Sequence, residues 1–284
     1  MKIVSSIALV HGAISILNAI SIGRGSALGI SLKVRAKIEL KRGEGRIIFK
    51  KKNSSLFRNI IHSILPNRII RENDIYLKID SEIPIGYGLK SSSAVSNAVS
   101  LACYNLLDSP INDFQVLNSA VSASKKARVT ITGAFDDASA CYYGGFVVTN
   151  NYSNRLIRRE SCYGNLYAII LIPNNSTRGD IMTLKIHKDL FNEVFKLVEN
   201  CAYWKAMNMN GVLVSSLLSY DYTPIISALK HGAISASISG NGPSIAVVTK
   251  EKNVNDIMSN LNQYGQTIVS KINNKKASVR RIIE

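Results

Sequence analysis

The densest group of residues suited to binding phosphate lies between positions 84 and 94. In order, the residues are Pro84, Ile85, Gly86, Tyr87, Gly88, Leu89, Lys90, Ser91, Ser92, Ser93 and Ala94. Two glycines let the backbone turn sharply and approach a ligand closely. A helix predicted over 93–107 follows, and its first turn offers N–H groups and a positive dipole end to an anion. The segment predicts a phosphate-binding loop, although it does not meet the Walker pattern. The alternative is a serine-capped helix after a glycine loop.

Two adjacent carboxylates form the second candidate, at Asp136 and Asp137. A carboxylate near a phosphate-binding loop could orient or deprotonate a hydroxyl that attacks the phosphate. We predict that Asp136 has this role and that Asp137 is its rival. One of the two could instead cap a helix that starts at Ala138. The basic run 125–128 before them could supply a cation near the phosphoryl group, or it is a solvated helix end.

Three weaker candidates lie elsewhere in the chain. The turn Gly240-Asn241-Gly242-Pro243 could form a backbone wall beside a ligand, but its residues are common in turns of every kind. Arg24 lies between two glycines and could pair with a substrate carboxylate, or it is an arginine on a surface loop. His11 and His231 lack a second ligand at metal spacing, so we interpret both as ordinary structural histidines.

The elements that must position these residues alternate between strands and helices, which predicts an α+β fold. Strands are predicted at 1–10, 27–40, 46–50, 75–79, 146–149, 167–172, 235–239, 244–249 and near 277–283, with a hairpin turn at 43–45. Helices are predicted at 56–65, 93–107, 111–128, 137–142, 190–207, 210–218, 223–231 and 254–264, and a helix or structured turn at 12–20. The polar stretch near 150–165 suggests two units, 1–155 and 156–284.

Charge and cysteine content narrow the function classes. The chain of 284 residues has 35 Lys and Arg against 19 Asp and Glu, a net charge of +16 that favours anionic ligands. The basic residues are spread out, and no nucleic-acid module signature is present, so we do not predict nucleic-acid binding as the main role. Four scattered cysteines indicate neither a zinc site nor a disulfide framework, which suits a reducing cytoplasm. Ser5 and Ser6 interrupt the apolar run 3–10 near the N-terminus, which argues against a signal peptide. No apolar stretch is long enough to span a membrane.

The chain resembles the GHMP kinases, the superfamily of galactokinase, homoserine kinase and mevalonate kinase. The segment 84–94 is similar to their Pro-x-x-x-Gly-Leu-Gly-Ser-Ser-Ala-Ala loop, with Lys90 and Ser93 in place of Gly and Ala. Gly-Leu-Lys-Ser-Ser-Ser-Ala resembles the archaeal-type shikimate kinase branch, as do segments 12–30 and 130–138. The segment 237–244 is similar to the third, glycine-rich motif. Four anchors thus occur in the expected order over nearly the whole chain.

The resemblance implies a two-unit fold, with an N-terminal unit like domain 2 of ribosomal protein S5 and a ferredoxin-like C-terminal unit. It implies ATP and Mg²⁺ as cofactors, the loop 84–94 as the ATP site, Ser92 as the hydroxyl on Mg²⁺, and transfer of the γ-phosphoryl group to shikimate in aromatic amino-acid synthesis. A metal-binding glutamate found in some relatives is missing from the helix before the aspartates. Homoserine or mevalonate kinase activity and a non-catalytic nucleotide-binding regulator are the alternatives.

Overall fold

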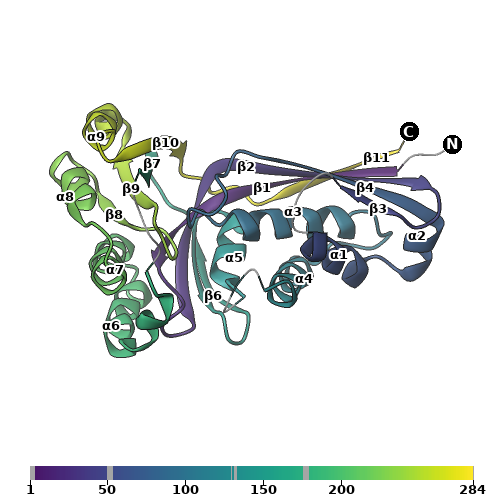
Figure 1. Cartoon of the computed structure of the whole chain (residues 1–284), viewed down its shortest axis with the longest axis horizontal. Helices are drawn as coiled ribbons and strands as arrows, with labels where there is room; N and C mark the ends of the chain where they lie inside the picture. Colours follow the sequence, from purple (N-terminus) through teal and green to yellow (C-terminus); the bar gives the residue numbers. More distant parts are fainter. Residues whose placement is uncertain (1–3, 50–53, 129, 131–132, 175–178, 284) are drawn as a thin grey trace.

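The computed structural model describes residues 4–49, 54–128, 130, 133–174 and 179–283. Two sheets, each with helices packed on it, lie side by side along the molecule (Figure 1). The larger sheet has the order β11-β1-β2-β4-β3, and β5 and β6 extend it from β2. The smaller sheet has the order β10-β7-β9-β8. This arrangement is the mixed α+β architecture that the sequence predicts.

Two long strands, β1 (Val4–Leu17) and β2 (Arg24–Arg42), form the antiparallel backbone of the larger sheet. The predicted helix or turn at 12–20 is wrong, because β1 continues through Leu17. Every residue from Val10 to Leu17 is buried, so this part of the strand is covered on both faces. A strand buried on both faces shows no alternation of apolar and polar residues, and its sequence cannot be told from a buried helix.

The predicted hairpin at 43–45 is also wrong. Strand β3 (Ile47–Phe49) runs parallel to β4 (Asn73–Ser81), and β4 lies between β3 and β2. Asp74 organises the bend: its Oδ1 accepts hydrogen bonds from the backbone N–H groups of Glu44 and Arg46 at 3.1 and 3.0 Å. The buried carboxylate of Asp74, about thirty residues along the chain, therefore sets the direction that the backbone takes after the turn at 43–45.

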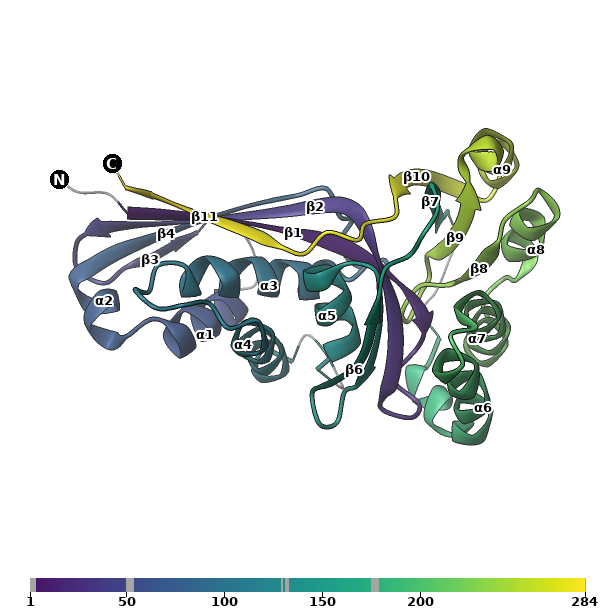
Figure 2. The same cartoon turned by 180° about the vertical axis from the view of Figure 1, so that it is seen from behind.

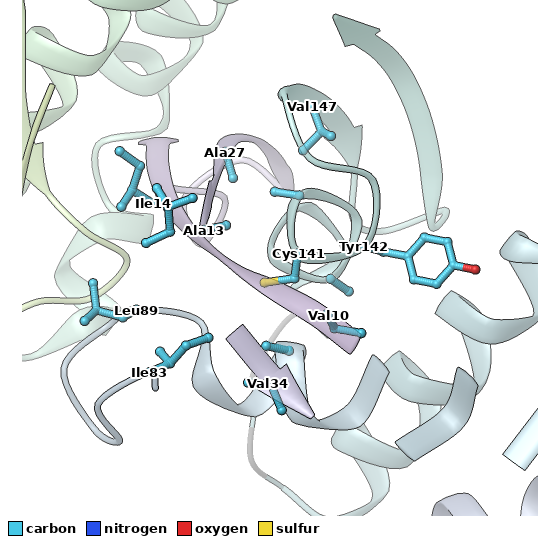
Figure 3. Packing of buried hydrophobic residues seen from close by; sticks show 14 of the residues in the cluster. Val10, Ala13, Ile14, Ala27, Val34, Ile83, Leu89, Cys141, Tyr142 and Val147 are labelled. Carbon is cyan, nitrogen blue, oxygen red and sulfur yellow. The ribbon is translucent and has the colours of Figure 1, made fainter. Parts of the chain in front are cut away.

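Helices of the first half of the chain cover one face of the larger sheet (Figure 2). Two later helices, α6 (Lys188–Glu199) and α7 (Tyr203–Leu218), also contact β1. The covering helices are α1 (Ser54–Ile64), α2 (Asn67–Glu72), α3 (Ser91–Tyr104), α4 (Asp113–Lys126) and α5 (Phe135–Tyr143). Predicted helices coincide with α1, α3 and α4 within a few residues. The core between helices and sheet is contiguous (Figure 3). Ile83 and Leu89 reach this core from either end of the segment 84–88, so the glycine loop is anchored at both sides.

The second half builds the smaller sheet from β7 (Leu166–Pro173), β8 (Ser235–Ile238), β9 (Ile245–Lys250) and β10 (Gly265–Lys271). Its helices are α6 (Lys188–Glu199), α7 (Tyr203–Leu218), α8 (Thr223–Lys230) and α9 (Val254–Leu261). The helix predicted over 190–207 is two helices, because the chain breaks at Cys201, whose φ is +58°. Strand β10 was not predicted.

Two strands from beyond residue 154 belong to the larger sheet. Strand β6 (Arg155–Glu160) pairs with β5 (Phe146–Asn150), and β11 (Ser278–Ile283) pairs with β1 along its first half. The division of the chain into units 1–155 and 156–284 stays a prediction. Among the described residues, no helix is both long and apolar enough to cross a bilayer.

Candidate functional site

A cleft of about 470 Å³ opens between the two halves of the molecule. Six segments line it: the end of β1 with the turn after it, the loop before α3 with the first turn of that helix, the end of α4 with the residues just after it, the start of α5 with the residues just before it, the segment at Ile181, and the turn between β8 and β9. The lining includes Ser15, Asn18, Ala19, Ile20, Pro84, Ile85, Gly86, Gly88, Leu89, Lys90, Ser91, Ser92, Ser93, Ser124, Arg128, Thr130, Gly133, Ala134, Asp136, Asp137, Ile181, Gly240, Asn241 and Gly242. Most residues of the predicted phosphate loop and both predicted aspartates therefore meet in one cavity.

The glycine loop is held against the turn between β8 and β9. Gly86 and Gly88 have φ values of +93° and +78°, which other residues adopt only with strain. A Cβ on Gly88 would collide with the carbonyl oxygen of Ser239. The Ser239 hydroxyl donates to the Gly88 carbonyl oxygen at 3.1 Å, and the Ser244 hydroxyl donates to the Tyr87 carbonyl oxygen. These contacts occupy the carbonyl oxygens of Tyr87 and Gly88 and hold the loop against the turn.

Helix α3 begins at this loop without a side-chain cap. Lys90 is the N-cap residue, in the left-handed region at φ +62°, and its side chain makes no capping hydrogen bond. The serine-capped helix considered from the sequence is therefore wrong. Ser92 is exposed and lines the cleft, whereas Ser91 is buried. A first turn without acidic residues, opening into a cleft, suits the phosphates of a nucleotide.

Lys90 connects the loop to the carboxylates. Its Nζ lies 2.8 Å from Asp137 Oδ1, and the two side chains are 5% and 16% exposed. Burial disfavours charge on Lys90, but Asp137 and Asp136 outweigh that effect and raise the pKa of its ammonium group. Burial is also the main reason why the pKa of Asp137 is raised to about 7, with Lys90 acting in the opposite direction. Gly240 faces the ammonium group, since a Cβ there would lie 2.9 Å from Nζ.

Asp136 is held by a neighbour that the sequence did not reveal. The Asn151 amide donates to Asp136 Oδ1 at 2.7 Å, and Asn151 Oδ1 accepts from the backbone N–H of Asp136 at 3.1 Å. Helix α5 begins at Phe135, not at Ala138, so both aspartates lie in its first turn and neither is its N-cap. The capping alternative is therefore wrong. Asn151 follows the buried strand β5 directly, but nothing in the local sequence pairs it with Asp136.

The turn between β8 and β9 is fastened to β1 by polar groups. Ser15 Oγ accepts from the Gly240 N–H at 2.9 Å, and the Asn18 amide donates to the Gly240 carbonyl oxygen at 2.8 Å. Asn210 Oδ1 in turn accepts from the Asn18 N–H at 2.9 Å. The turn lines the cleft, and its role as a backbone wall beside a ligand stays a prediction. Asn18 and Asn210 were missed, and their only signal is that each is an asparagine within a largely apolar segment.

Of the two arginines Arg24 and Arg128, one lies away from the cleft and the other lines it. Arg24 Nη2 donates to Asn192 Oδ1 of α6 at 2.7 Å, and its guanidinium lies 4.3 Å from the centre of the Phe195 ring. Arg24 is not among the described residues that line the cleft, so the predicted pairing with a substrate carboxylate has no support. Arg128 follows α4, is exposed and lines the cleft. Its φ of +54° is strained for an arginine.

No group of three or more His, Cys, Asp or Glu side chains that could hold a metal ion occurs in the part of the chain that the structure describes. A cation in the cleft would therefore depend on a nucleotide's own phosphate oxygens, with one or two oxygens from the protein. The exposed Ser92 hydroxyl and the two aspartates offer such oxygens. The role of Ser92 on Mg²⁺ stays a prediction.

Comparisons with known proteins agree with this geometry. Residues 55–145 match the family described as the GHMP kinases N terminal domain. The chain is 33% identical to the shikimate kinase of Methanothermobacter thermautotrophicus, over 98% of this chain and 99% of that protein. It is 39% identical to the shikimate kinase of Pyrococcus furiosus, over 84% and 89% of the two chains.

The comparison with a solved structure bears on the fold alone, because the sequence identity is low. The Methanococcus jannaschii mevalonate kinase superposes with a TM-score of 0.72 at 16% identity, covering 94% of this chain and 98% of that chain. The resemblance predicted from the loop at 84–94 and its companion motifs is thereby confirmed, because full-length similarity, family match and fold agree. The chain belongs to the GHMP kinase family, in the branch of the archaeal shikimate kinases.

Proposed function

We propose that this chain transfers the γ-phosphoryl group of ATP to the 3-hydroxyl of shikimate, in aromatic amino-acid synthesis in the cytoplasm. The observation that carries the proposal is the meeting of the glycine loop, Lys90 and the Asp136–Asp137 pair in one cleft. The choice of acceptor rests on the relatives, which are named shikimate kinases and match this chain over most of their length. We also propose that residues 1–155 and 156–284 act as two units with the cleft between them.

The nucleotide end of the cleft would be the loop and the first turn of α3. Gly88 and Gly240 let the loop and the turn between β8 and β9 pack closely together, with the Lys90 ammonium group beside Gly240. The N-terminus of α3 and the ammonium group of Lys90 would offset the negative charge of the phosphates. Mg²⁺ bound to ATP would neutralise further charge on the phosphates, with Ser92 as its protein ligand.

The acceptor end would lie at Asp136. As the shikimate hydroxyl oxygen bonds to the γ-phosphorus, the bond from that phosphorus to the β–γ bridging oxygen breaks and ADP leaves. The hydroxyl proton moves to Asp136. Asn151 occupies Oδ1, so the proton would be received at Oδ2. Asp137, paired with Lys90, would hold that lysine at the phosphates, so the two aspartates have different roles.

Shikimate carries a carboxylate, which requires a cation in the cleft. Of the described residues that line the cavity, Lys90 and Arg128 are the cations, and Lys90 is already paired with Asp137. We therefore propose Arg128 as the carboxylate-binding residue, since a guanidinium can donate two parallel hydrogen bonds to a carboxylate.

The experiment that tests the function is ADP release with MgATP and a panel of acceptors: shikimate, homoserine, mevalonate, galactose and none. Turnover with shikimate alone is the expected result. Turnover with a different acceptor would contradict the substrate and leave the kinase chemistry in place. ATP binding without turnover on any acceptor would contradict the proposal and favour a nucleotide-binding regulator.

A further inference from the structure

Asp136 is held by a side chain that is not among the described residues lining the cleft. Asn151 is fully buried and lies fifteen residues beyond Asp136, just after β5. Two hydrogen bonds join the pair: the amide donates to Asp136 Oδ1, and Oδ1 of Asn151 accepts from the Asp136 N–H. Because these bonds fix both the side chain and the backbone of Asp136, they set where the carboxylate lies.

The orientation of the Asn151 amide is itself determined. Its Oδ1 also accepts from the Thr149 hydroxyl, at 2.8 Å. A flipped amide would place its NH₂ group against the N–H of Asp136, leaving two donors face to face. The NH₂ group must therefore face the carboxylate. The backbone N–H of Asn151 donates to the Gly23 carbonyl oxygen at 2.7 Å, which fastens the socket to the start of β2.

The other carboxylate oxygen, Asp136 Oδ2, takes its position because Gly25 has no side chain. A Cβ on Gly25 would lie 2.5 Å from Asp136 Oδ2 and 2.7 Å from the Ala19 Cβ. The carboxylate thus lies over bare backbone of β2, beside the turn residues Ala19 and Ile20 that line the cleft. Asn151 takes one oxygen and leaves the second over Gly25, near Ala19, which lines the cavity as Asp136 does.

We infer that Asn151 is a positioning residue for the reaction: it holds Asp136 so that Oδ2 meets the acceptor hydroxyl, and Thr149 holds Asn151. This inference rests on the proposed role of Asp136 in phosphoryl transfer. Asn151 also satisfies an N–H in the first turn of α5, which has no side-chain cap at Ala134. A purely structural role would therefore also make its loss harmful, and the test must separate the two roles.

A double-mutant cycle separates them. Asn151→Ala should lower kcat about 100-fold, the size expected when a reacting group is misplaced by about 1 Å, with the KM values for ATP and acceptor within about twofold. Asp136→Asn should lower kcat by about 10²–10⁴-fold. In the double variant, kcat should equal that of Asp136→Asn alone, because Asn151 then has no base left to position.

Two outcomes would overturn the inference: kcat losses that multiply in the double variant, or an Asn151→Ala variant in which only KM changes. Thr149→Val, which is nearly isosteric and keeps Asn151, serves if Asn151→Ala does not fold. It should lower kcat by a smaller factor, and this loss should also vanish in the Asp136→Asn background.

The cycle needs only ADP release, so it is run with whichever acceptor the panel identifies, or with water if the panel identifies none. Failure of shikimate as acceptor overturns the proposed function and leaves the cycle interpretable. Equal effects of Asn151→Ala with and without Asp136 overturn the inference and leave the proposed function standing.

Discussion

At the scale of single residues, the buried charges in the cleft form an unbalanced group. Lys90 is paired with Asp137, and Asp136 lies beside them in the first turn of α5, held by a neutral amide. Above the raised pKa of Asp137, one cation among two carboxylates leaves net negative charge where polyphosphate is proposed to bind. The N-terminus of α3 and a metal ion carried by the nucleotide must then offset the remaining charge.

This arrangement predicts a specific pH dependence of stability. The pKa of Asp137 is raised from 3.8 to about 7, so between these values the native state holds a proton that the unfolded chain releases. The free energy of unfolding should therefore fall as pH rises through this window. In Asp137→Asn that contribution is absent. Urea unfolding from about pH 5 to about pH 8 should show wild type losing stability relative to the variant. Parallel curves would contradict the prediction.

Arg128 makes a second prediction at this scale. Arg128→Ala should raise the KM for shikimate about 10- to 100-fold, since a hydrogen-bonded charge pair contributes about 1.5–3 kcal/mol. The KM for ATP should stay unchanged. Lys126→Ala is the matched control, because Lys126 ends the same helix but lines a separate groove between α1 and α4. A rise in the KM for ATP instead would place Arg128 at the phosphates.

At the scale of elements, the glycine loop and the turn between β8 and β9 act as one structure, because hydroxyls of the turn hold carbonyl oxygens of the loop. Gly88→Ala should therefore move the loop and raise the KM for ATP at least about 10-fold, on top of about 1–2 kcal/mol of left-handed backbone strain. Gly164→Ala is the control: its φ is +98°, but an added Cβ would meet only ordinary contacts with Leu166. Equal KM values in both variants would show that the loop tolerates the collision.

Elements with strong periodicity were predictable, and those defined by distant contacts were not. Helices α1 and α4 show amphipathic spacing, and the long strand β2 alternates along its second half. The second half of β1 does not alternate, because both of its faces are buried, and so its sequence suggested a helix. The short, polar β6 gave no strand signal, since its edge position leaves its side chains largely in solvent.

At the scale of the whole molecule, the sequence predicted which segments take part in the site but not how they are fixed there. The loop, the aspartates and the glycine turn were all expected to take part in ligand binding or catalysis, from their resemblance to known motifs. The side chains that hold them, Asn18, Asn151 and Asn210, were not. Their partners lie 15 to more than 200 residues away, and no local pattern records such a contact.

The strand order of the larger sheet has a consequence for what counts as a unit of this protein. The segment 55–145 matches the family's N-terminal domain, yet β4 alone of that sheet's strands falls inside it. Strands β1, β2, β3, β5, β6 and β11 come from either side of the segment. Excised, it would leave the apolar faces of α3 and α5 without a sheet to cover them. The stretch that matches the family's N-terminal domain therefore lacks most of the sheet on which its own helices pack, and we do not expect it to fold by itself.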